Sequence, residues 1–343
     1  MAFSIRKYHD AATARLGYRY NHPIGGDGRG GALAFRVVNI EHPAEVHARA
    51  GQLIVAMDGG TVTIPIEDIL MLIADAPNVR LSTMCLSMLA EHHVMVVTMG
   101  RNHLPSSLTI PTVSNARQAR VAIAQAGLGR DLADRLWTRV VVRKMLNQAD
   151  ALEALGDEGA SEVRSFASQV EVGDPTNREG AAAHCYFSHL KPGLCRRKGD
   201  PLNSALNYGY AIVRAAMVRS LVAAGFVPAL GIHHHSQLNA FNLADDLMEP
   251  FRPVVDLRAV EVTGTDEKLS SAQRKSLRGV LHDEVRLGSG RMSVLRAIES
   301  MGTGFRGAIY CEDASLLPLP ELAGSVSVGP AAAACATAGE QCA

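Results

Sequence analysis

The hydrophobic pattern of the chain changes its period near residue 113, and this change limits the possible folds more than any other feature. Between residues 32 and 110, short apolar runs alternate with turn residues, as in QLIVAM (52–57), Asp58-Gly59-Gly60 and TVTIPI (61–66). Two such runs joined by a glycine-containing turn predict a β-hairpin. After residue 113 the apolar residues recur with a period near 3.6, which predicts helices. We therefore expect an α+β fold, with an N-terminal β domain at 32–110 and a larger all-α C-terminal domain at 111–314.

The two ends of the chain differ in composition from these domains. Residues 1–31 end in a glycine-dense stretch that packs poorly, which predicts a flexible leader. Residues 315–343 are dominated by Pro, Ala, Gly and Ser, which predicts a disordered tail.

One helix of the second domain is predicted to be central. Between Asn203 and Ala224 apolar residues cover most of the circumference, and Gly225 suits the C-cap. We predict further helices at 114–126, 131–155, 158–170, 243–261, 270–285 and 289–300. Pro250 and Pro253 require the 243–261 helix to end, kink or restart.

Charge and cysteine content exclude several classes of protein. The 34 basic residues balance 34 acidic ones, which argues against a polycation that binds nucleic acid or membrane by global charge. No stretch of about 18 uncharged apolar residues predicts a membrane span. The six cysteines form no C-x-x-C pair, so we expect a reducing cytoplasm rather than a disulfide framework. Local basic stripes remain, such as Lys191 with the run Arg196, Arg197 and Lys198.

The sequence contains two groups of residues that could bind a metal ion. His233, His234 and His235 are consecutive, and Asp246 and Glu249 follow at a spacing that puts both carboxylates on one face of a helix. Neighbouring carboxylates repel each other unless a cation compensates them, and an imidazole can complete the ligand set. Each group also has a structural alternative. The histidines can form a loop that caps a helix, and the acidic residues can form a solvated helix start.

A third segment, GDPTNREGAAAHCYF (173–187), predicts a turn followed by a helix of small residues. Glu179 lies at the start of that helix. A plain acidic helix start is the simpler interpretation, but catalytic carboxylates also need such rigid positions.

Taken together, these segments resemble the CRISPR-associated integrase that captures new spacers, the first of the universal adaptation proteins. The similarity covers roughly residues 32–310. Its most specific parts are GDPTNREGAAAHCYF and the long segment from DPLNSALNYGY to GIHHHSQLNAFNLADDLMEPFRP. The LNYGY and LADDLMEPFRP words look most like the branch that accompanies single-protein effector nucleases.

The resemblance implies a site and a reaction. Glu179, His234 and Glu249 match the family's catalytic metal ligands, and Asp246 matches a nearby acid in a supporting role as ligand or proton acceptor. His233 and His235 flank the ligand position, so the choice among the three histidines stays open. One imidazole and several carboxylates suit Mg²⁺ or Mn²⁺. The implied activity is metal-dependent DNA cleavage, and joining of 3′-OH ends into a CRISPR repeat array by transesterification.

The resemblance also implies a β-sandwich for the N-terminal domain and a set of partners. These are double-stranded DNA (pre-spacer and repeat), a second copy of the chain, and a small companion Cas adaptation protein in a heterohexamer-like complex. An effector nuclease is a further candidate, and the sequence does not show whether it joins. Lys191, Arg196, Arg197 and Lys198 could steer the DNA backbone toward the metal. Two rival functions are a zinc-type hydrolase, suggested by the histidines, and a catalytically inactive DNA-binding scaffold.

Overall fold

The chain forms two compact units that divide between residues 114 and 115. The computed structural model describes residues 36–111, 117–192, 200–265 and 268–323. The predicted leader at 1–31 therefore lies outside the described residues. No helix in these four ranges is both long and apolar enough to span a membrane.

The N-terminal unit is built from two four-stranded sheets. One has the order β1-β5-β7-β8 and the other β4-β3-β2-β6. The strands are β1 (Arg36–Ile40), β2 (Ala44–Arg49), β3 (Gln52–Met57), β4 (Gly60–Pro65), β5 (Ile69–Ala74), β6 (Val79–Leu81), β7 (Met95–Met99) and β8 (Pro105–Thr109). The predicted hairpin is confirmed, because β3 and β4 pair antiparallel with Met57 opposite Gly60.

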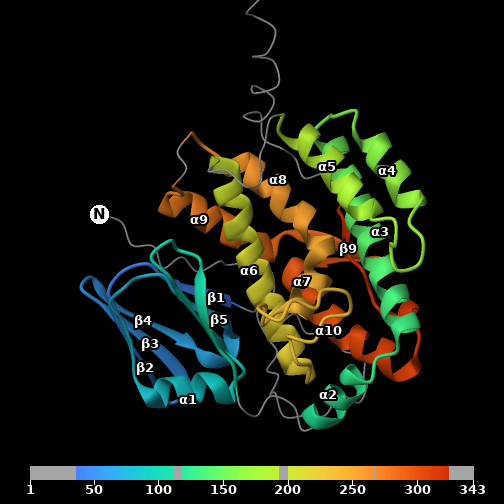
Figure 1. Ribbon diagram of the computed structural model, residues 1–343. Helices are drawn as coiled ribbons and strands as arrows, with labels where there is room; N and C mark the ends of the chain where they lie inside the picture. The colour runs from blue at the N-terminus through green and yellow to red at the C-terminus, as the bar shows by residue number, and fades with distance from the viewer. Residues whose placement is uncertain (1–35, 112–116, 193–199, 266–267, 324–343) are drawn as a thin grey trace, which may run out of the picture. The chain divides into compact units, whose positions relative to one another are not determined.

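Apolar residues from both sheets and from one helix form a single core in this unit. Alternate residues of β3, Leu53 and Val55, are fully buried in it together with Val38 and Ile40 of β1. The helix α1 (Thr83–Glu91) contacts both sheets, at β2 and β7 (Figure 1). Its N-cap is Ser82, whose hydroxyl accepts the N–H of Cys85 at 3.1 Å.

The second unit is mostly helical and is organised around α6. Its helices are α2 (Gln118–Ala126), α3 (Arg130–Ala154), α4 (Ala160–Ser168), α5 (Arg178–Leu190), α6 (Pro201–Ala224), α7 (Asn242–Met248), α8 (Arg252–Val262), α9 (Ser271–Arg278) and α10 (Val294–Cys311). The predicted central helix is confirmed: α6 packs against α7, α8, α9 and α10, and Gly225 ends it in the left-handed conformation (φ 94°) (Figure 1). Helices α3, α4 and α5 pack beside one another.

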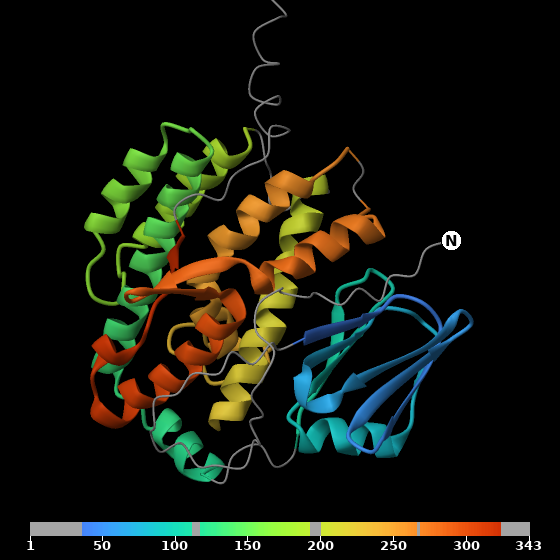
Figure 2. The same ribbon diagram turned by 180° about the vertical axis from the view of Figure 1, so that it is seen from behind.

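The prediction of an all-α second domain is wrong. The region predicted as helices 270–285 and 289–300 contains the strands β9 (Glu284–Leu287) and β10 (Gly290–Ser293), which pair antiparallel around Gly288 (φ 60°). Figure 2 shows this small sheet in orange beside α10, with which both strands are in contact. The strands are too short for their period-two pattern to stand out between two helical segments.

The predicted disorder of the tail is also wrong for residues 315–323. A 3-10 turn at Ala314–Leu316 is followed by the strand β11 (Glu321–Leu322), which pairs with β9. The side chain of Asn147, fully buried in α3, accepts the N–H of Leu322 and donates to the carbonyl of Pro320. The remaining tail residues lie outside the described ranges.

The prolines divide the 243–261 segment as expected. Helix α7 ends at Met248, the 3-10 helix η2 spans Glu249–Phe251, and α8 starts at Arg252. This division brings Glu249 to the start of a new turn.

Candidate active site

Glu179 is held at the first turn of α5 by two capping side chains. Asn177 is the N-cap, in the left-handed conformation (φ 52°), and its side chain accepts the N–H of Gly180 at 3.2 Å. Asp174 accepts the N–H groups of Arg178 and Glu179 at 2.8 and 3.0 Å. A Cβ at residue 180 would lie 2.7 Å from the Asn177 side chain, so any other residue there would displace this cap. The backbone of Glu179 is therefore rigidly placed.

Glu179 and Glu249 meet at Lys144, although they lie on different elements. The Lys144 ammonium, buried at the middle of α3, donates to Oε1 of Glu179 and lies 2.5 Å from Oε2 of Glu249. Arg252, one turn beyond Glu249, donates from Nε to its Oε1 at 2.8 Å. We call the group of Lys144, Glu179, Glu249 and Arg252 the carboxylate cluster.

The electrostatics of the carboxylate cluster favour the charged forms of Glu249 and Lys144. Burial by itself raises the pKa of Glu249, but Arg252 and Lys144 outweigh it and hold that pKa at about 2. Burial lowers the pKa of Lys144, but the charges of Glu249 and Glu179 outweigh it and raise the pKa above its ordinary value. Glu249 thus stays ionised beside the cations of Lys144 and Arg252.

The histidine loop is organised by Asp246, a completely buried residue of α7. One carboxylate oxygen accepts the N–H groups of Ile232 (2.7 Å) and His233 (3.0 Å). The other accepts the N–H of His234 (3.2 Å) and lies 2.5 Å from Nδ1 of the same residue. Both oxygens of Asp246 are engaged, so its role in this structure is to position the loop.

The loop requires a glycine at its start. A Cβ on Gly231 would lie 2.3 Å from the carbonyl oxygen of His234 and 2.7 Å from the carboxylate of Asp246. The sequence word GIHHH is therefore a tight turn folded around one buried carboxylate.

The three histidines have different surroundings. The ring of His233 stacks on Trp137 with centroids 4.0 Å apart, and burial and His234 lower its pKa. The ring of His234 meets Trp137 edge-on at 5.6 Å, and its Nδ1 is taken by Asp246. That hydrogen bond raises the pKa of His234 although burial opposes it, and the charge of Glu249 adds to the increase. His234 thus presents Nε2 outward, within the field of Glu249.

Two further residues of this region, both on α3, were not predicted from the sequence. Trp137 touches the histidine loop, and Lys144, one heptad later, joins the two glutamates. Lys144 had a signal, because it interrupts a row of buried positions spaced three and four apart: Trp137, Val141, Lys144, Gln148 and Ala151. A lysine in such a row must have a charged partner.

The side chains of Glu179, Glu249 and His234 are of the chemical types that bind a divalent cation. Two carboxylates from separate elements converge on one buried positive charge. The imidazole of His234 is fixed through Nδ1 by the carboxylate of Asp246, as is usual for a metal-bound histidine. In the structure Lys144 supplies that charge. The ligand atoms of Glu179, His234 and Glu249 do not all lie within 4.8 Å of one another, whereas those of one other group in the described ranges do: Glu162, Cys185 and His189.

The predicted DNA-binding residues are only partly described. Lys191, at the end of α5, forms an ion pair with Asp200, the N-cap of α6, at 2.9 Å. Arg196, Arg197 and Lys198 lie outside the described residues.

Comparisons with known proteins agree on one family. The family model for the CRISPR associated protein Cas1 matches residues 38–289. The CRISPR-associated endonuclease Cas1 of Neisseria meningitidis serogroup C (strain 8013) is 34% identical over 295 residues, which cover 84% of this chain and 97% of the relative. A CRISPR-associated endonuclease Cas1 of Pyrobaculum aerophilum is 29% identical over 68% of this chain and 84% of its own length.

Solved structures share the fold. A casposase bound to its integration product superimposes with a TM-score of 0.67 at 16% identity, covering 82% of this chain and 91% of the casposase chain. A Cas1 protein from Thermotoga maritima gives 0.63 at 17% identity, covering 80% and 97%. A chain of a Cas6-RT-Cas1–Cas2 complex gives 0.65 at 16% identity, covering 88% of this chain and 37% of its own length.

Proposed function

The chain belongs to the Cas1 family of CRISPR-associated proteins, and from this premise we propose that it is the metal-dependent DNA integrase of spacer acquisition. Its substrate is the 3′-OH end of a captured DNA fragment, which it joins to a strand of the CRISPR repeat. The observation that carries the proposal is the meeting of Glu179 and Glu249 at one buried ammonium, on the helix that also touches the histidine loop.

The residues of the site divide the work between ligands and supports. Glu179, Glu249 and Nε2 of His234 would hold Mg²⁺ or Mn²⁺, which supplies polarisation of the phosphodiester and activation of the attacking hydroxyl when bound. Asp246 fixes the tautomer of His234 by accepting from Nδ1, so that Nε2 carries the free lone pair. Arg252 holds one oxygen of Glu249 and leaves the other to face Lys144.

The joining reaction is a balanced exchange of phosphodiester bonds. The 3′ hydroxyl oxygen forms a bond to phosphorus and loses its proton, while the bond from phosphorus to the 3′ oxygen of the repeat strand breaks and that oxygen gains a proton. Strand cleavage is the same exchange with water as the attacking group. The DNA that is positioned at the site decides between the two reactions.

Partners and subtype are part of the proposal. We propose a homodimer that assembles with the small companion protein Cas2 on double-stranded DNA. The fold similarity to a chain of a Cas6-RT-Cas1–Cas2 complex supports the companion. The LNYGY and LADDLMEPFRP words support the branch that accompanies single-protein effectors, whose nuclease is a further candidate partner.

A strand-transfer assay tests the function. Labelled pre-spacer duplex and a repeat-containing plasmid are incubated with this chain and Cas2, in Mg²⁺, Mn²⁺ or Zn²⁺. We expect Glu179→Gln, His234→Ala and Glu249→Gln to abolish joining while DNA binding persists. Full joining by all three variants refutes the assignment, and activity in Zn²⁺ alone favours a zinc hydrolase. An intact wild-type chain that binds DNA but no divalent ion favours an inactive scaffold.

A further inference from the structure

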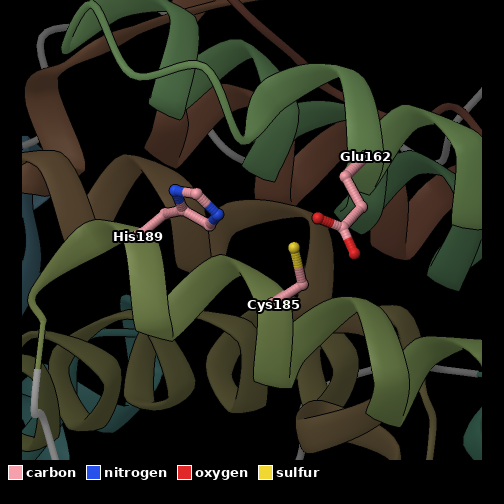
Figure 3. A group of neighbouring side chains, drawn as sticks. All are labelled: Glu162, Cys185 and His189. Carbon is pink, nitrogen blue, oxygen red and sulfur yellow. The ribbon is translucent and has the colours of Figure 1, made fainter.

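A second group of metal-ligating side chains lies between α4 and α5, apart from the carboxylate cluster. It consists of Glu162 on α4 and of Cys185 and His189 on α5, and its ligand atoms all lie within 4.8 Å of one another. Figure 3 shows the thiol, the carboxylate and one ring nitrogen of His189 pointing toward a common centre. We propose that these three residues bind a thiophilic divalent cation, with Zn²⁺ as the preferred ion.

The spacing on α5 favours such a site. Cys185 and His189 are four residues apart, so both side chains lie on the same face of the helix. Ligand atoms around a tetrahedral zinc lie about 3.5 Å apart, given bonds of about 2.0–2.3 Å. All three atoms lie within 4.8 Å of one another, so no pair exceeds this spacing by more than about 1.3 Å. Rotation of the exposed side chain of Glu162 can supply that residue's part of the shift.

The orientation of His189 is built into the surrounding structure. Its Nδ1 lies 2.8 Å from Oδ1 of Asp157, and the same oxygen accepts the N–H of Gly159 at 2.8 Å. Nδ1 is thus occupied, and the nitrogen that faces Cys185 and Glu162 is Nε2. A histidine that binds zinc through one ring nitrogen is usually supported by a carboxylate at the other, as Asp157 supports Nδ1 here.

Gly159 is required for this arrangement. A Cβ at residue 159 would lie 2.6 Å from carbon atoms of the His189 ring. The imidazole therefore packs directly on the backbone that begins α4, and any larger residue would displace it.

The donor atoms of the group indicate which metal it prefers. A sulfur ligand beside an imidazole selects zinc over Mg²⁺, whereas Glu179 and Glu249 offer only oxygen. Three protein ligands leave the fourth position to water.

The site would tie α5 to α4. Because α5 also carries Glu179 at its first turn, an ion between the two helices fixes the helix from which that carboxylate projects. The inference does not depend on the proposed DNA chemistry.

Cobalt substitution tests the site in the full-length chain. The chain is freed of metal with a chelator and titrated with Co²⁺, and thiolate-to-cobalt charge-transfer absorption reports a sulfur ligand. We expect the wild type to show this band and Cys185→Ser to lose it. A cation held by Glu179, His234 and Glu249 has no sulfur ligand and gives no such band, so the two sites are distinguished by their spectra.

Matched variants complete the test. Glu162→Gln and Asp157→Asn should weaken Zn²⁺ binding, the latter by about 10- to 100-fold, as expected for a supporting carboxylate. Glu162 is exposed, and the amide that replaces the Asp157 carboxylate keeps an oxygen to cap Gly159, so both variants should fold. Exposed His184 on the same helix provides the control His184→Gln, which should bind as the wild type does.

Two outcomes overturn the proposal. One is a thiolate band that survives in Cys185→Ser. The other is a band that disappears when Cys195, Cys311, Cys335 and Cys342 are replaced by Ser while Cys185 is kept. Under the proposal that fourfold variant retains the band, and Zn²⁺ raises its Tm, since binding only the folded state stabilises it.

Discussion

At the scale of single residues, the site depends on charges that are buried together. Lys144 is the residue on which Glu179 and Glu249 converge, and its side chain is only 9% exposed. Removing one partner of a buried ion pair leaves the other charges uncompensated, which costs more than the pair contributes.

Lys144→Met should therefore destabilise the metal-free chain by about 3 kcal/mol. Adding Mn²⁺ should recover part of this loss, because a bound cation replaces the missing charge. Urea unfolding with and without Mn²⁺ measures both effects. The matched control is Lys191→Met, which removes a more exposed ion pair with Asp200 and should cost less than about 1 kcal/mol. Equal losses in the two variants would contradict the central role of Lys144.

The low pKa of Glu249 predicts that the folded protein loses stability in acid. Its folded-state pKa of about 2 lies below the ordinary 4.5, so its contribution to stability is complete above pH 4.5 and is lost as the pH falls toward 2. A depression of this size corresponds to about 3 kcal/mol. Glu249→Gln should remove this part of the acid dependence, so the difference in unfolding free energy between wild type and variant should shrink between pH 4.5 and 2. A difference that stays constant over this range would show that Glu249 titrates normally.

At the scale of elements, the second unit depends on close contact between α6 and α8. A Cβ at Gly209 of α6 would lie 2.4 Å from Cγ1 of Val255, whereas a Cβ at Gly307 of α10 would meet nothing within 4 Å. The two glycines share a helical setting and differ in the space around them.

Gly209→Ala should lower the free energy of unfolding by about 1–3 kcal/mol through overpacking. Gly307→Ala should raise it by about 0.5–1 kcal/mol, because alanine loses less backbone entropy in a helix. Denaturant titration of both variants checks the contrast. Stabilisation by both substitutions would mean that α8 shifts away at little cost.

The elements show where sequence patterns suffice and where they fail. The β3–β4 hairpin, the cap at Ser82 and the central helix α6 follow from local signals: a turn glycine, a hydroxyl at the helix start and apolar residues around most of a helix. The β9–β10 hairpin was missed because its strands are too short for their pattern to stand out, and β11 pairs with β9 from a distant part of the chain, where the buried side chain of Asn147 holds Leu322. No local pattern encodes such a pairing.

At the scale of the whole molecule, a neutral net charge is compatible with binding DNA if the charges are unevenly distributed. Neutralising Arg196, Arg197 and Lys198 together should weaken DNA binding and reduce the magnitude of the salt slope by about 2–3, since each lost phosphate contact contributes roughly 0.9. Binding measured from about 50 to 200 mM salt gives this slope. An unchanged slope would show that these three residues make no contacts with DNA phosphates.

The sequence by itself determined the division of the chain into a β-rich and a helical part, the family, and the identity of Glu179, His234 and Glu249 as candidates. These features rest on local periodicity and on short words of the chain. Only the tertiary structure revealed that Lys144 joins the two glutamates, that Asp246 holds the histidine loop from within the core, and that Glu162 lies against Cys185 and His189. The physical reason is that a buried charge is compensated by whichever group lies nearest in space, and packing, not sequence spacing, selects that group.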